Sequence, residues 1–149
     1  MKTLLTSIAG ALAVLALTTS PALAKPGWSE DYAKASAQAK AEKKLLLIDF
    51  TGSDWCGWCI KLDKEVFAKP EFEEYAKKNL VLVEADFPQK KELPKEVKAQ
   101  NEKLQKEYKV QGYPTIVVLN AEGKKVGELG YQPGGPAAFI AELEKLKGK

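Results

Sequence analysis

Residues 54–59 read DWCGWC and contain both cysteines of this 149-residue chain. The hydrophobic residues 45–50 come just before and predict a buried central strand, because they are apolar without alternation. Residues 60–68 follow and predict a helix, which Pro70 closes. Two cysteines separated by two residues, between a buried strand and a helix, are typical of a redox site. The sequence therefore predicts thiol–disulfide chemistry at residues 54–59.

The two cysteines are expected to play different roles. Cys56 lies at the start of the predicted helix, where unpaired backbone N–H groups and the helix dipole stabilise a thiolate. The thiolate is the form that attacks disulfides. Cys59 lies one turn later, within reach to close a disulfide or to resolve a mixed disulfide. We predict that Cys56 is the exposed, reactive thiol and that Cys59 is the more buried one.

Two other uses of the cysteine pair stay open at this point. A structural disulfide is one, although a bridge across two residues constrains the unfolded chain less than a long loop would. A metal site is the other. Zinc normally takes four ligands, and this chain has two cysteines and no histidine, whereas two thiolates could hold copper(I). We expect redox chemistry, with no metal and no cofactor.

Three motifs resemble those of the thioredoxin superfamily, and they occur in its order. Residues 55–59, WCGWC, resemble its active site, commonly written Trp-Cys-Gly-x-Cys. Residues 110–115, VQGYPT, resemble its cis-proline loop, and Asp49 with Phe50 resembles its strand with a buried acid. Together they cover most of the chain from about Leu45 onward. The chain looks most like secreted bacterial thioredoxin-like proteins.

The resemblance implies a fold and a substrate surface. The fold is a thioredoxin-like three-layer α/β sandwich, in which helices flank a mixed central β-sheet. A cis Tyr113–Pro114 bond would pack against Cys56 and expose the backbone of Tyr113 to an extended substrate. An ordinary strand-entry proline and two packing indoles are the structural alternatives. The expected substrate-binding residues are Trp55, Gly57, Trp58, Tyr113 and Pro114.

Asp49 is the candidate proton carrier and the third expected catalytic residue after Cys56 and Cys59. An acid within an apolar strand is costly to ionise, so burial should raise its pKa. Resolution requires Cys59 to lose a proton, and the chain has no histidine to accept it. Glu84 on the neighbouring strand would raise the pKa further if the register brings it close. The alternative is an acid that is solvated at the strand end or caps the next loop.

The remaining patterns predict the order helix, strand, helix, strand, helix, hairpin, helix. This order gives an α/β sandwich with a mixed sheet. Ser29 is the predicted N-cap of the first helix. The other predicted elements are helices at 30–43, 70–79, 94–108 and 137–147, a strand at 80–87, and a hairpin formed by 115–120 and 125–130.

Residues 1–24 are predicted to be a signal peptide, with residues 25–149 as one thioredoxin-like domain. A positive start, an apolar run and the small residues Ala22 and Ala24 fit a cleavage site before Lys25. An uncleaved anchor is the alternative, but the run is shorter than the roughly 20 residues that span a bilayer. The leader implies the periplasm or the outside, where disulfides persist, and no stable membrane anchor.

The composition limits the partners. The formal charge is +3 and every basic residue is lysine, so no arginine fork is present and we expect no nucleic-acid partner. We predict an exported, monomeric thiol–disulfide oxidoreductase that acts on protein thiols and disulfides and is recharged by an unidentified redox partner. The sequence leaves the direction of electron flow open. The alternative is a non-catalytic binding, chaperone or copper-handling module that keeps the thioredoxin fold.

Overall fold

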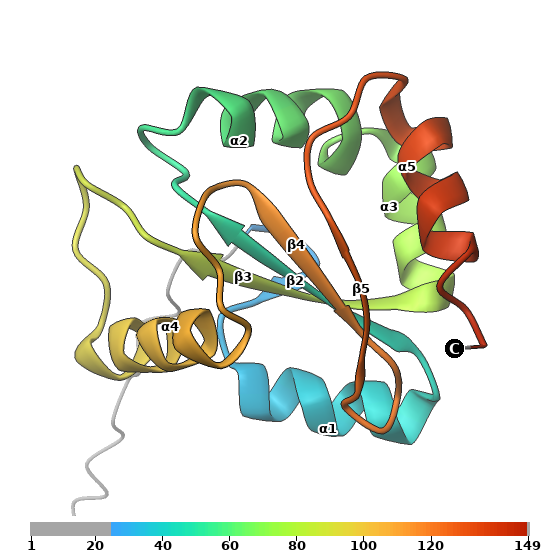
Figure 1. The fold of residues 1–149 in the computed structure, drawn as a ribbon, viewed down its shortest axis with the longest axis horizontal. Helices are drawn as coiled ribbons and strands as arrows, with labels where there is room; N and C mark the ends of the chain where they lie inside the picture. Colours follow the sequence, from blue (N-terminus) through green and yellow to red (C-terminus); the bar gives the residue numbers. More distant parts are fainter. Residues whose placement is uncertain (1–24, 149) are drawn as a thin grey trace, which may run out of the picture.

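The computed structural model describes residues 25–148, and Figure 1 shows a β-sheet between two layers of helices. The five strands lie in the order β1-β3-β2-β4-β5. β3 is parallel to β1 and β2, whereas β4 is antiparallel to β2 and β5. The sheet is therefore mixed, and the predicted fold class is confirmed. The strands are β1 (Trp28–Ser29), β2 (Leu45–Thr51), β3 (Leu80–Asp86), β4 (Thr115–Leu119) and β5 (Lys125–Leu129).

The helices cover both faces of the sheet. α1 and α4 lie below it in Figure 1, and α2, α3 and α5 lie above it. A π-helical turn, η1, continues α2 without a break. The bounds are α1 (Tyr32–Glu42), α2 (Gly57–Leu62), η1 (Asp63–Phe67), α3 (Pro70–Asn79), α4 (Lys95–Glu107) and α5 (Gly135–Glu144).

The central strand β2 divides the hydrophobic core into two halves. Leu45 and Leu47 pack in the cluster formed with α2, η1, α3 and α5, whereas Leu46 and Ile48 pack in the cluster formed with α1 and α4. Every residue of β2 is buried, which explains its apolar run. Because side chains alternate along a strand, Asp49 points to the same face as Leu47, the face that α2 covers.

The start of the first helix differs from the prediction. Ser29 does not cap α1, because it lies in β1 and pairs with Val83 of β3. Asp31 is the N-cap instead, and its carboxylate accepts a hydrogen bond from the backbone N–H of Lys34 at 2.9 Å. β1 was not predicted, since two residues are too few to show a hydrophobic period.

The helix after the cysteines also differs in detail. The sequence predicted one helix over 60–68, but the structure has α2 from Gly57 and then the π-helical turn from Asp63 to Phe67. Short π-helical segments occur often at functional sites. At the other end of the chain, α5 begins at Gly135, two residues earlier than predicted, with Pro136 in its first turn.

The predicted leader, residues 1–24, lies outside the described residues. Across residues 25–148, no helix combines the length and the apolar character that crossing a membrane requires.

Candidate redox site

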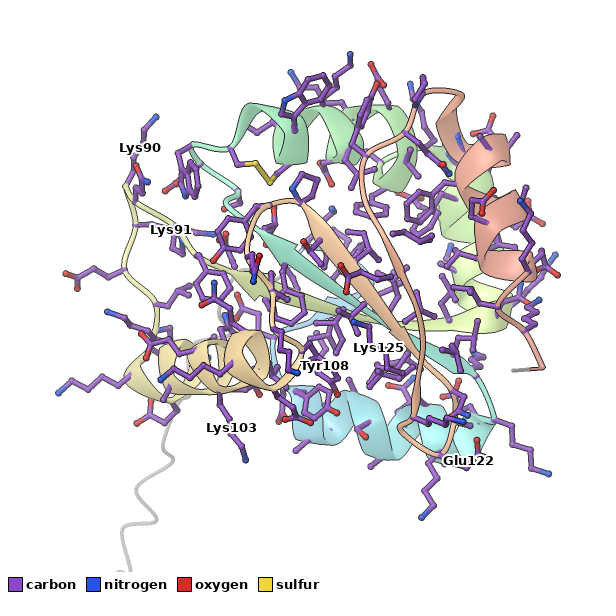
Figure 2. All side chains as sticks on the ribbon, viewed as in Figure 1. Lys90, Lys91, Lys103, Tyr108, Glu122 and Lys125 are labelled. Atoms are coloured by element: carbon purple, nitrogen blue, oxygen red, sulfur yellow. A yellow bond between two sulfur atoms is a disulfide. The ribbon has the colours of Figure 1, made fainter. Side chains whose placement is uncertain are left out.

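Cys56 and Cys59 form a disulfide at the start of α2, drawn as a yellow bond in Figure 2. Cys56 is the N-cap residue with an extended backbone, and Gly57 is the first helical residue. The Sγ atom of Cys56 accepts a hydrogen bond from the backbone N–H of Cys59 at 3.3 Å. A sulfur atom that replaces a capping oxygen stands where the helix start favours negative charge.

The expected contrast in exposure between the two cysteines is absent from this oxidised state. Cys56 is 7% exposed and Cys59 is 5% exposed, so both are nearly buried. The reason is geometric, because the Cys56 sulfur turns back over the first turn of the helix to bond with Cys59. The two sulfurs therefore differ in their place on α2, with Cys56 at the N-cap and Cys59 in the first turn, and hardly in their exposure.

An aromatic group flanks the first cysteine. Trp55 is 41% exposed, and its ring meets the ring of Tyr113 edge-on, with centroids 5.9 Å apart. Tyr113 in turn stacks on Phe87 at 5.2 Å, and Nε1 of Trp55 donates to the backbone oxygen of Phe87 at 2.7 Å. The structure thus brings the predicted residues Trp55 and Tyr113 together.

A second aromatic group flanks the other cysteine. Trp58 is 57% exposed and packs against Tyr131 at 5.0 Å. The ammonium group of Lys61 lies over both rings, 5.2 Å from the Trp58 centroid and 5.1 Å from the Tyr131 centroid. The hydroxyl of Tyr131 donates to Glu65 at 2.7 Å. The indole of Trp58 is therefore held in place on one side and open to solvent on the other.

The Tyr113–Pro114 peptide bond is cis, as the resemblance implied. Pro114 is half-buried and directly precedes β4. The Tyr113 hydroxyl accepts a hydrogen bond from Nε2 of Gln105 in α4 at 2.7 Å. Gln105 thereby fixes the hydroxyl end of the Tyr113 ring, and Phe87 packs on its face.

Sequence analysis missed Phe87, Tyr131 and Lys61 as members of this rim. Phe87 and Tyr131 come from loops far from residues 54–59 in the chain, so no local pattern joins them to the cysteines. One signal was present for Phe87, because it directly follows β3, whose parallel neighbour β2 leads to the cysteines. The carboxyl ends of parallel strands are where ligands bind in α/β sheets.

Asp49 is a buried acid with an unsatisfied oxygen. It is 5% exposed, and its Oδ1 atom has no hydrogen-bond partner within residues 25–148. Burial raises its pKa to about 8, the charge of Lys25 opposes this rise, and Glu84 adds to it. Asp49 pairs in register with Glu84, so the two side chains share one face of the sheet, as the sequence analysis anticipated. Burial raises the pKa of Glu84 as well.

Asp86 ties the segment before the cysteines to the loop after β3. Its carboxylate accepts hydrogen bonds from the Ser53 backbone N–H at 2.9 Å and from the Ser53 hydroxyl at 2.6 Å, and it pairs with Lys91 at 2.9 Å. The Asp54 carboxylate accepts from the backbone N–H groups of Gln89 at 2.9 Å and Lys90 at 2.7 Å. Figure 2 labels Lys90 and Lys91 on this loop.

Within the described part of the chain, no group of three or more His, Cys, Asp or Glu side chains is arranged to hold a metal ion.

The sequence is similar to those of known thioredoxin-like proteins, among them a disulfide bond reductase. A family model described as a thioredoxin-like domain matches residues 32–147. The disulfide bond reductase DsbH of Chlamydia pneumoniae is 42% identical over 115 residues, which cover 77% of this chain and 69% of DsbH. The thioredoxin-related protein DsbJ of the same organism is 31% identical over 103 residues, which cover 69% of this chain but 30% of DsbJ.

Solved structures agree with these sequence matches. A structure titled DsbH oxidoreductase superposes with a TM-score of 0.77 at 38% identity and covers 93% of this chain and 94% of that one. A thioredoxin from Thermus thermophilus superposes with a TM-score of 0.60 at 22% identity, covering 82% of this chain and 87% of that one, and it supports the fold alone.

Proposed function

The chain belongs to the thioredoxin-like family and is a protein-disulfide oxidoreductase, and from this premise we propose that it works as a reductase of protein disulfides. The observation that carries the proposal is the Cys56–Cys59 disulfide at the first turn of α2, in a chain that is 42% identical to a disulfide bond reductase. A bridge across two residues is easily opened and closed by exchange, since its two sulfurs stay within reach of each other.

The reaction proceeds through two exchanges. In the reduced protein the Cys56 thiolate attacks one sulfur of the substrate disulfide, the substrate S–S bond breaks, and one substrate thiolate leaves. Cys59, once deprotonated, then attacks the Cys56 sulfur of the mixed disulfide. The Cys56–Cys59 bond forms, the second substrate thiolate leaves, and two electrons have passed from the cysteine pair to the substrate. A dithiol of the redox partner returns them.

Asp49 accepts the proton that Cys59 loses. Three observations support this role: the acid is buried, its Oδ1 atom has no partner among the described residues, and it shares the sheet face that α2 covers. Its pKa of about 8 lies close to the ordinary pKa of a cysteine thiol, about 8.5, so a proton passes between the two groups at little cost.

The rim around the disulfide binds the substrate chain. Trp55 and Trp58 present apolar surface on either side of the cysteines, and Tyr113 and Pro114 form the edge beside Trp55. Gly57 adds no side chain to this surface, and apart from its chain neighbours and its own helix no atom lies within 4 Å of the position that its Cβ would take. An extended polypeptide with a disulfide fits this arrangement better than a compact ligand does.

The protein acts outside the cytoplasm, after removal of residues 1–24, as a monomer. Its substrates are protein disulfides, and its partner is a thiol reductant of that compartment. The composition of the leader and the exchangeable disulfide support this location.

Reduction of insulin by dithiothreitol tests the function. We expect the chain to accelerate the reaction and the double variant Cys56→Ser/Cys59→Ser to leave it at the rate of dithiothreitol alone. Equal rates for the two proteins would instead indicate a binding module without turnover. The redox potential of the pair tests the direction, since a reductase should lie near thioredoxin, about −270 mV, rather than near the oxidant DsbA, about −120 mV.

Trapping of substrates tests the roles of the two cysteines. Cys59→Ser should accumulate mixed disulfides through Cys56, because the resolving thiol is missing, and Cys56→Ser should not. The species are counted on non-reducing gels after acid quenching. Trapping by Cys56→Ser alone would reverse the assignment.

A further inference from the structure

The chain segment before α1 is fixed to the helix that carries the cysteines. Lys25, Pro26, Gly27 and Trp28 form a turn, in which the Trp28 backbone N–H donates to the Lys25 oxygen at 2.9 Å. Gly27 has φ = +81°, which the third position of a type II turn requires, and proline is common at the second. The Trp28 side chain is buried and packs against Phe67 of η1, with centroids 5.0 Å apart.

This anchored turn holds the Lys25 ammonium group in one place. Lys25 forms an ion pair with Asp63, the residue four positions after Cys59 and the first of η1. The ammonium also lies 4.5 Å from the ring centroid of Trp28 and 5.0 Å from that of Phe67. Two aromatic faces and a carboxylate together restrict a side chain that is otherwise flexible.

Acids gather on the sheet face beside this ammonium. Asp49 and Glu84 are paired in register on β2 and β3, and Asp86 lies two residues beyond Glu84, so all three side chains point to the α2 face. Asp63 approaches the same region from η1. Burial raises the pKa of Asp49 and of Glu84, and Lys25 opposes the rise for both. Lys91 also lowers the pKa of Glu84, but its ammonium is paired with Asp86.

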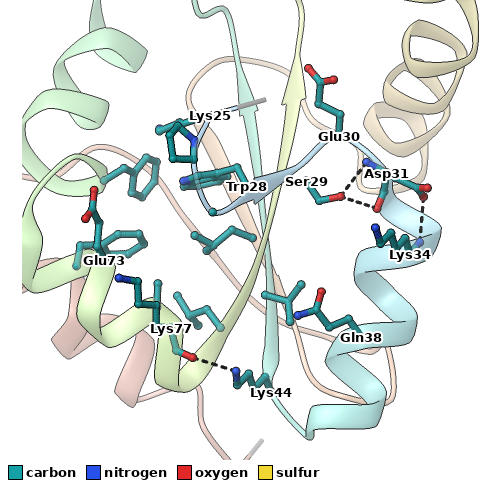
Figure 3. A pocket seen from close by; sticks show the side chains of 18 of the residues that line it. Lys25, Trp28, Ser29, Glu30, Asp31, Lys34, Gln38, Lys44, Glu73 and Lys77 are labelled. Atoms are coloured by element: carbon teal, nitrogen blue, oxygen red, sulfur yellow. Dashed lines mark hydrogen bonds between the residues drawn. The ribbon is translucent and has the colours of Figure 1, made fainter. Parts of the chain in front are cut away.

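Lys25 lies at one end of a groove that water enters. The groove has a volume of about 1390 Å³ and runs along β1 and the edge of β3, between α1 and α3. Figure 3 shows Lys25 beside Trp28 at its upper end, with Glu73 and Lys77 farther along. Lys25 and its partner Asp63 both line this groove, on a part of the molecule that residues 54–59 do not form.

We propose that Lys25 is a positioning residue for the redox pair: held by the N-terminal turn, its charge balances the acids behind the disulfide and sets how readily Asp49 takes the proton of Cys59. The inference rests on the proposed role of Asp49. It assigns a part in the chemistry to a segment outside the cysteine motif and the cis-proline loop, so the docking of that segment is coupled to the resolving step.

Titration of the Asp49 carboxyl group tests the first half of the inference. Carboxyl carbon shifts are followed by NMR against pH in the oxidised protein, produced from the full chain, as wild type, Lys25→Met, Lys25→Gln and Lys25→Arg. We expect the Asp49 midpoint to rise by about one pH unit in Lys25→Met and Lys25→Gln, which lack the side-chain ammonium, and to stay near the wild-type value in Lys25→Arg. The use of two such variants guards against a folding defect in one of them.

Lys77→Met is the matched control. Lys77 lines the same groove and is exposed, but its charge is not among the influences on Asp49. We expect the control to leave the Asp49 midpoint unchanged. An Asp49 midpoint that does not move in Lys25→Met, or that moves equally in Lys77→Met, would overturn the inference.

Single-turnover kinetics test the second half. A mixed disulfide is formed on Cys56, and its closure by Cys59 is followed over a range of pH. In Lys25→Met the profile should move to higher pH by the same amount as the Asp49 midpoint, which slows closure about tenfold at pH 7, while the first attack by Cys56 is unchanged. A shifted Asp49 midpoint with an unshifted closure profile would also overturn the inference. Failure of the proposed function looks different, because the wild type itself would then not reduce insulin.

Discussion

Gly52 supports the indole ring of Trp55. A Cβ atom at this position would lie 2.5 to 2.8 Å from three ring atoms of Trp55, which is closer than real contacts allow. The backbone oxygen of Gly52 also accepts hydrogen bonds from the N–H groups of Trp55 at 3.2 Å and Cys56 at 2.8 Å. Gly52 therefore fixes both the Trp55 ring and the backbone that leads into the disulfide.

Gly52→Ala should push the Trp55 ring off its place and break its hydrogen bond to Phe87. We expect kcat/KM for a protein disulfide to fall severalfold and the free energy of unfolding to fall by about 1–3 kcal/mol. A small disulfide that makes no use of the rim should be reduced at nearly the wild-type rate. Gly112→Ala is the control, since its Cβ would meet no atom within 4 Å. Equal losses in both variants would contradict the role of Gly52.

Asp49→Asn replaces the buried acid with an amide of the same shape that does not titrate. We expect closure of the Cys56–Cys59 disulfide to slow on the order of 10²-fold, because the general base is lost, and its pH dependence to flatten. The first attack by Cys56 should change by less than about twofold, since the Cys56 thiolate has no proton to transfer to Asp49. Rapid mixing with a fluorescent disulfide substrate separates the two steps. If both steps keep their rates, Asp49 is structural and the proton goes to solvent.

At the level of elements, the loop before α2 and the loop after β3 are joined through Asp86 and Asp54. Besides the side-chain bonds, the Phe87 backbone N–H donates to the oxygen of Thr51 at 2.8 Å. Nδ2 of Asn101 in α4 also donates to the backbone oxygen of Asp86 at 3.0 Å. The position of the disulfide therefore depends on α4 and on the loop after β3, which is far from the cysteines in the sequence.

Asp86→Ala should loosen this connection. The substitution leaves the Ser53 N–H and the Lys91 ammonium without their buried acceptor, which costs about 3 kcal/mol of unfolding free energy in a urea titration. Asp54→Ala removes a carboxylate that caps the same loop from an exposed position, so its loss should be smaller. A larger loss for Asp54→Ala would place the critical contact in the outer loop instead.

The elements differ in how far the sequence predicted them. β2, β3 and α3 were predicted almost to the residue, because an unbroken apolar run or a helical period bounded by proline marks each of them. β1 and η1 were not, since a two-residue strand and a π-helical turn leave no period. The cysteines, Asp49 and the cis-proline pair were predictable from local motifs. Phe87 and Tyr131 were not, because only the folded chain brings them to the site.

For the molecule as a whole, buried acids dominate how the free energy of unfolding changes with pH near neutrality. The chain has no histidine, so among the side chains of residues 25–148 Asp49, with its pKa raised from 3.8 to about 8, is the main group of the oxidised protein that titrates there. The unfolded chain releases this proton near pH 4, whereas the folded chain keeps it up to about pH 8. Between these values the folded state binds more protons, and stability falls as the pH rises.

The oxidised protein should therefore lose stability between pH 5 and pH 8, by up to about 1.4 kcal/mol per pH unit from Asp49. Glu84, whose pKa is raised by burial as well, contributes in the same direction. Urea titrations at several pH values measure the slope, and Asp49→Asn should flatten it. A profile that is equally flat in the wild type and in Asp49→Asn would show that Asp49 is already ionised in the fold at these pH values. The exposed carboxylates with lowered pKa values act only at acid pH, with the opposite sign: Glu42, Asp54, Glu74 and Glu144.

The two exposed indoles also give the molecule an optical signal of its own. Trp55 and Trp58 are each bonded to a cysteine of the pair, whereas Trp28 is buried against Phe67. An excited indole near a disulfide can lose its energy by passing an electron to the S–S bond, and a dithiol accepts no such electron. Emission should therefore rise on reduction, and the rise should shrink in Trp58→Phe or Trp55→Phe. Each turnover could then be followed without a label, from the light that the protein itself emits.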